Sequence, residues 1–81
     1  MSIRDKVVKT LIDTLKIDSE EVNDDLAVGE HPKWDSLGHA LLLVALEFEF
    51  KCQFDIDETL DMESVGDIVE IIEERFGTTS E

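Results

Sequence analysis

The stretch HPKWDSLGHALLLVAL, residues 31–46, decides how this chain is organised. It starts with polar residues and the only proline, Pro32, and then becomes a long apolar segment. A helix that is apolar on nearly every side is either buried centrally or keeps part of its surface for a partner. We expect this helix to run from Ser36 to about Phe50. The residue to explain is Ser36, a hydroxyl at the head of the most apolar helix in a very acidic chain.

Apolar residues at helical spacing predict another helix over residues 3–16, where Ser2 and Asp5 can form a capping pair. From residue 17 to residue 35 the periodicity fades, which indicates a long loop. A loop of this length in so small a protein is usually functional or held by its own apolar residues. The residues expected to hold it are Ile17, Val22, Leu26, Val28 and Trp34.

The second half of the chain predicts two more helical segments. Residues 53–63 are long enough for one or two helical turns, and a final helix starts at Ser64 and stops at Gly77. The sequence therefore predicts an all-α fold, a small bundle of three main helices and one short one, as a single domain over residues 1–77 with a flexible tail at 78–81. In its core we expect Leu42, Leu46 and Phe50 to pack with Val8, Leu11, Ile12, Val65, Ile68 and Ile72.

The charge balance narrows the choice of partners. The 81 residues include 21 acids and seven bases, for a net charge of -14. This balance argues against nucleic acid as a ligand, because phosphate binding depends on Lys and Arg. Residues 1–16 hold four of the seven bases, so the excess negative charge lies from Asp18 onward. We expect partners that carry basic patches on their docking surfaces.

The single cysteine, Cys52, cannot form an internal disulfide, which fits a reducing cytoplasm and a buried or idle thiol. The longest unbroken apolar run, Ala40 to Leu46, is far too short to span a bilayer. We expect a cytoplasmic monomer with no membrane partner.

A metal site is not expected. The aspartates of residues 55–61 resemble a fragment of a calcium-binding loop, but such a loop needs Gly and Glu where this chain has Leu60 and Gly66. His31 and His39 have no Cys or second His at ligand spacing, which argues against zinc.

Three uses of Ser36 are possible from the residues alone. It could be the N-cap of its helix, because serine is a favoured cap. It could be a nucleophile with His39 as base, but the G-x-S-x-G turn is absent, and Trp34 and Gly38 stand in its place. It could also be a covalent attachment point, where a phosphodiester would face the free N–H groups and the positive end of the helix.

Three stretches together carry a resemblance to a known family. Asp35-Ser36-Leu37 heads the apolar helix, ALEFEF follows at residues 45–50, and the acidic FDIDETLDMESVGDIVEIIEERF occupies residues 54–76. In this order the chain resembles an acyl carrier protein over nearly its whole length. The resemblance implies a four-helix bundle that is not an enzyme and carries 4′-phosphopantetheine on Ser36. A magnesium-using phosphopantetheinyl transferase would install that arm from coenzyme A, and the reactive thiol would belong to the arm.

The resemblance also implies roles for the residues around Ser36. Asp35 and Leu37 would flank the attachment point, and acyl- or aminoacyl-loading and acyl-transfer enzymes would bind the outer face of the apolar helix. The partner-binding residues would be Leu37, Ala40, Leu41, Val44, Glu47, Asp57 and Asp61. The acyl pocket would be lined by Leu42, Leu46, Phe50, Phe54, Met62 and Ile68. For Leu37 and Val44, burial in the core is an equally good reading of the pattern.

The chain also departs from carriers of fatty acid synthesis. Gly38, Leu41 and Phe48 stand where an acid would be unsurprising, so the helix is more apolar near the serine. Our hypothesis is a stand-alone carrier of a specialised pathway whose cargo is a fatty acyl, polyketide, hydroxyacyl or aminoacyl group held as a thioester. The alternative is an unmodified acidic module that binds a partner through the apolar helix.

Overall fold

Helix α1 (Ile3–Leu15) opens the fold and is stabilised at both ends. The Ser2 hydroxyl accepts a hydrogen bond from the Asp5 N–H at 3.1 Å, and the Asp5 carboxylate accepts one from the Ser2 N–H, so the predicted capping pair is confirmed. The helix ends where Lys16 adopts a left-handed backbone and its N–H donates to the Ile12 carbonyl at 2.8 Å.

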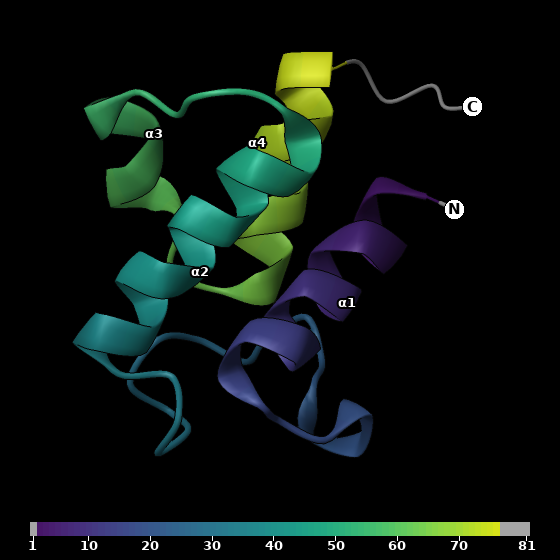
Figure 1. The fold of residues 1–81 in the computed structure, drawn as a ribbon, viewed down its shortest axis with the longest axis vertical. Coiled ribbons are helices and arrows are strands. Elements are labelled where there is room, and N and C mark those ends of the chain that lie inside the picture. Colours follow the sequence, from purple (N-terminus) through teal and green to yellow (C-terminus); the bar gives the residue numbers. More distant parts are fainter. Residues whose placement is uncertain (1, 77–81) are drawn as a thin grey trace.

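The structure is a computed structural model, and it describes residues 2–76. After α1 come a short 3-10 turn, η1 (Ser19–Glu21), and the helices α2 (Ser36–Phe50), α3 (Ile56–Asp61) and α4 (Val65–Phe76). In Figure 1, α2 lies between α1 and α3, and α4 passes behind it. The predicted all-α bundle with one short helix is confirmed, and the predicted helix stop at Gly77 and tail at 78–81 lie outside the described residues.

The long loop before α2 is held against the bundle, as predicted. Ile17 and Trp34 are buried, and Val22, Leu26 and Val28 are half-buried against the core. Backbone hydrogen bonds add to this packing, because the Val28 N–H donates to Glu63 at 2.8 Å and the Leu26 carbonyl accepts from Val65 at 2.9 Å. The loop therefore approaches α2 from a fixed position.

The core lies between α1, α2 and α4. Its fully buried side chains include Val7, Leu11, Leu42, Leu46, Met62, Val65, Ile68 and Ile72. This agrees with the prediction except at Ile12, which is half-buried and lies outside the packed cluster. The buried stripe of α1 advances in steps of four residues through Val7, Leu11 and Leu15, which turns the neighbouring Ile12 away from the core.

Candidate functional site

Ser36 is the first residue of α2, and the N-cap of the helix is Asp35. The Asp35 carboxylate accepts a hydrogen bond from the Gly38 N–H at 2.8 Å, and Asp35 has the extended backbone of an N-cap. The alternative in which Ser36 is the cap is therefore wrong. The Ser36 residue is exposed, and its hydroxyl has no hydrogen-bond partner among residues 2–76. A modifying enzyme can reach this hydroxyl without breaking a bond inside the protein.

Gly38 brings the loop onto the first turn of α2. A Cβ atom at this position would lie 2.6 Å from the Lys33 carbonyl oxygen and 3.0 Å from the Leu15 side chain. Both distances are shorter than van der Waals contact, so a side chain here would push the loop away. The Lys33 ammonium also donates to the Lys16 carbonyl at 2.9 Å, which ties the loop to the end of α1.

The ring of Trp34 also holds the contact between the loop and the first turn of α2, here called the junction, from the side of the core. Trp34 is fully buried, and its indole Nε1–H donates to His39 Nδ1 at 3.0 Å. Burial lowers the pKa of His39, although a hydrogen bond with the Met62 backbone and the charge of Glu63 oppose this shift. A neutral imidazole that accepts at Nδ1 is what the Trp34 bond requires. His39 is thus occupied as a structural partner, which leaves the nucleophile alternative for Ser36 without its base.

The electrostatics around Ser36 fit a phosphodiester. The first turn of the 15-residue helix α2 contains no acid, and the Asp35 carboxylate beside it is engaged with the Gly38 N–H. The positive end of the helix dipole and the N–H groups of the first turn favour an anion at this place. The chemistry of the site therefore accommodates the prosthetic group that the sequence resemblance implies.

The apolar residues predicted to bind partners lie on the outer face of α2. Leu37 is 70% exposed and Val44 is 63% exposed, and Ala40 and Leu41 are exposed as well. The reading in which Leu37 and Val44 belong to the core is wrong. Because Leu42 and Leu46 fill the inner face, these residues are turned to solvent by the helical period.

The predicted acidic residues separate into two groups. Asp57 and Asp61 are exposed on α3, as a partner-binding role requires. Glu47 is half-buried, and its carboxylate accepts the Phe54 N–H at 2.9 Å, so it also holds the α2–α3 connection.

The side chains predicted for an acyl pocket are packed as core. Leu42, Leu46, Met62 and Ile68 are fully buried, and Phe50 and Phe54 are half-buried. Met62, like the other buried members of this set, has no exposed surface. These residues lie together, either in the buried cluster or packed against it.

Several features around α3 were not predicted from the sequence. The Arg75 guanidinium of α4 pairs with Glu58 of α3 at 2.6 Å and lies over the Phe54 ring. Two apolar residues of the short helix α3, Ile56 and Leu60, are exposed. The sequence signal that could have identified them is their spacing of four residues, which places both on one face of a helix that otherwise carries acids.

Metal-binding and thiol chemistry are not prominent features of the described chain. Within residues 2–76 no three His, Cys, Asp or Glu side chains converge closely enough to hold a metal ion. Cys52 is half-buried, and burial raises the pKa of its thiol. In the same part of the chain no helix has the length and apolar character needed to cross a bilayer.

Comparison with known proteins finds relatives along nearly the whole chain. No protein-family profile matches it. The acyl carrier protein of Solidesulfovibrio magneticus is 31% identical over 77 residues, which cover 95% of this chain and 99% of the relative. The acyl carrier protein of Chlamydia trachomatis serovar D is 32% identical over 75 residues, covering 93% and 97%. That of Chlamydia caviae is 30% identical over 77 residues, covering 95% and 100%.

Proposed function

The chain belongs to the acyl carrier protein family, and we propose that Ser36 is the residue that carries its prosthetic group. Members of this family carry a covalently attached 4′-phosphopantetheine and are carriers rather than enzymes. They work with a phosphopantetheinyl transferase and with biosynthetic enzymes. The observation that carries the proposal is the exposed hydroxyl at the first position of α2, which is free because Asp35 caps the helix.

The attachment reaction needs only access and a suitable electrostatic setting from this chain. A bond forms between the Ser36 oxygen and the phosphorus next to the pantetheine of coenzyme A, the pyrophosphate P–O bond breaks, and adenosine bisphosphate leaves. The hydroxyl proton is lost in the same exchange. Because His39 is bonded to Trp34, the base must come from the transferase.

Once attached, the arm would offer a thiol that holds the cargo as a thioester. The chain's own residues keep the attachment point in place. Asp35 stabilises the first turn of α2, and the absence of a side chain at Gly38 lets the loop pack against it. Leu37, exposed directly after the serine, is placed where an enzyme acting on the arm would touch it.

The apolar residues of α2 support partners other than those of housekeeping fatty acid synthesis, because Gly38, Leu41 and Phe48 leave the helix more apolar near the serine. We therefore assign the chain to a specialised pathway with acyl or aminoacyl cargo, with Leu42, Leu46, Phe50, Phe54, Met62 and Ile68 as the shelter for whatever part of the cargo enters.

Intact-protein mass spectrometry tests the attachment. The purified protein is measured before and after incubation with coenzyme A, magnesium and a broad-specificity phosphopantetheinyl transferase. We expect the gain of one phosphopantetheine in the wild type and in Ser19→Ala, a control at an exposed serine of η1, and none in Ser36→Ala. Loading of Ser36→Ala, or no loading of the folded wild type by several transferases, would contradict the proposal.

A further inference from the structure

His39 connects three parts of the fold close to Ser36. It lies on the first turn of α2, three residues after the serine, and its Nδ1 accepts the indole N–H of Trp34 from the loop at 3.0 Å. A neutral imidazole that accepts at Nδ1 carries its proton at Nε2, so Nε2–H is the donor in its hydrogen bond with the Met62 backbone. One ring therefore holds both the loop and the end of α3 against α2.

The indole of Trp34 depends on this hydrogen bond, because its ring is enclosed. Trp34 has no exposed surface, and the centres of the Trp34 and His39 rings lie 6.0 Å apart. An indole N–H can only donate, so without His39 it would be a buried donor without an acceptor. Water cannot replace His39 while the indole stays in the core.

A second proton on His39 is incompatible with this arrangement. Both nitrogens of the charged ring are donors, so an Nδ1–H and the Trp34 N–H would point at each other across 3.0 Å. Turning the ring over does not restore an acceptor, whereas a donor for the Met62 backbone is still present. Protonation thus breaks the link to the loop and keeps the link to the end of α3.

The charges around His39 decide at which pH this happens. Burial sets the pKa of His39 below its ordinary value of 6.5, although the negative charge of Glu63 favours the charged ring. The other charged groups of the junction, Asp35 and Lys33, are each hydrogen-bonded to the backbone, at 2.8 Å and 2.9 Å. The ring is therefore neutral at neutral pH and becomes charged in acid.

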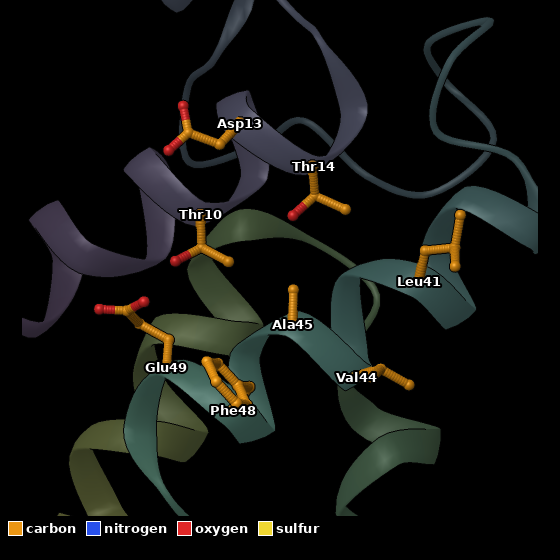
Figure 2. A pocket seen from close by; sticks show the side chains of 8 residues that line it. All are labelled: Thr10, Asp13, Thr14, Leu41, Val44, Ala45, Phe48 and Glu49. Carbon is orange, nitrogen blue, oxygen red and sulfur yellow. The ribbon is translucent and has the colours of Figure 1, made fainter.

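The contact between α2 and α1 does not depend on a titratable group in the same way. Figure 2 shows Thr10 and Thr14 of α1 turned toward Ala45 of α2. Within residues 2–76, neither carboxylate that lines the groove beside them, Asp13 or Glu49, forms a hydrogen bond to the other helix. A change of charge at His39 therefore leaves α1 and α2 packed together.

We propose that His39 is a proton-sensitive latch for the junction, whose neutral ring fixes Trp34 and the end of the loop and whose charged ring releases them. Trp34 precedes Ser36 by two residues, so a movement of the indole reaches the start of α2. For its effect on the arm, this inference rests on the proposed function. The attachment point is thus held in a fixed position at neutral pH and loosened in acid.

The first test is a pH titration of the labelled full chain without its arm, followed by NMR between about pH 8 and about pH 5. The chain has one Trp and two His, so the Trp34 indole signal and the ring signals of His39 and His31 can each be identified. His39→Gln is measured beside the wild type, because glutamine keeps an acceptor and a donor but binds no proton. The amide of Leu11, a buried residue of α1, is the internal control.

We expect the Trp34 indole signal to move with the midpoint of the His39 ring and to stay constant in His39→Gln. The protection of the indole N–H against exchange with water should fall about tenfold or more on protonation, as for the local loss of a hydrogen bond. The Leu11 amide should not change.

Three results for the indole signal would overturn the proposal: it stays constant while His39 titrates, it follows the midpoint of His31 instead, or it titrates equally in His39→Gln. A simultaneous change at Leu11 would also overturn it, because the release would then be global unfolding.

The loading rate of Ser36 tests the effect on function. Coenzyme A, magnesium and one transferase are supplied to the wild type and to His39→Gln at each pH, and the ratio of the two rates removes the pH dependence of the enzyme. This ratio should fall in proportion to the fraction of His39 that is neutral. A constant ratio would overturn the effect of the latch on the serine. If neither protein is loaded at any pH, the proposed attachment fails, and the indole titration alone decides on the latch.

Discussion

Two sides of helix α2 have opposite properties. At the junction with the loop, Trp34 is fully buried, Gly38 has no space for a methyl group, and His39 accepts a hydrogen bond from Trp34. On the outer face, Leu41 is 52% exposed and Phe48 is 84% exposed, so much of their apolar surface is not used by the fold. The junction fixes where Ser36 lies, and the outer face is left for other molecules.

Helix α2 thus uses different residues for stability and for recognition. Substitutions at the junction should change the free energy of unfolding and the position of Ser36. Substitutions on the outer face should change binding with little effect on folding. The following substitutions test this separation, starting with the largest expected effect.

Replacing Trp34 with Ala should have the largest effect. It removes the largest fully buried side chain and the hydrogen bond to His39. We expect the free energy of unfolding to fall by about 3–5 kcal/mol, measured by denaturant titration. If this variant does not fold, Trp34→Phe gives a milder loss for the same reason. Unchanged stability in both would contradict the anchoring role of the ring.

Replacing Gly38 with Ala should cost less but act closer to the serine. The added methyl would meet the Lys33 carbonyl, so the loop must move, at a cost of about 1–3 kcal/mol. Transferase loading of Ser36 should also slow, measured by the rate of mass gain. A variant that is more stable, as expected of alanine in an unhindered helix, would show that the close approach is unimportant.

His39 should make the junction sensitive to pH. Its pKa is lowered by burial in the folded protein from the ordinary value of 6.5, so the unfolded chain binds a proton first as the pH falls. The free energy of unfolding should therefore decrease below about pH 6.5, until the pH passes the folded pKa. His39→Gln should reduce this slope in denaturant titrations at several pH values. Equal slopes in the wild type and His39→Gln would contradict the prediction.

The smallest effect on folding is expected on the outer face. Phe48→Glu replaces a side chain that is mostly in solvent, so the free energy of unfolding should stay within about 0.5 kcal/mol of the wild type. Denaturant titration beside the Trp34 variants gives a direct comparison of the two sides of α2. A loss of 2 kcal/mol or more, on the order of a core substitution, would show that the outer face belongs to the fold.

The elements that local sequence specifies could be predicted. The helices follow from apolar periodicity, and the start of α1 follows from Ser2 and Asp5, three residues apart. The loop could be predicted to pack on the bundle because its apolar residues, among them Ile17 and Trp34, have no helix of their own. Ser36 could be singled out by its position at the head of the apolar helix.

Details that depend on packing between distant residues could not be predicted. The contact between Gly38 and Lys33, and the bond from Phe54 to Glu47, require the loop and α3 to be placed in space first. The apolar character of α2 on every side also hid which residues are exposed. Only the packing of Leu42 and Leu46 inward shows that Leu37 and Val44 face solvent.

The most direct test of the attachment point is a phosphorus–proton correlation spectrum of the loaded protein. After incubation with coenzyme A, magnesium and a transferase, the phosphodiester phosphorus should correlate with the β protons of Ser36. Amide shifts should be confined to the first turn of α2, with the Trp34 indole signal unchanged, because the junction is already formed. A correlation with another serine would contradict Ser36 as the carrier of the arm, and a shifted Trp34 signal would contradict a preformed junction.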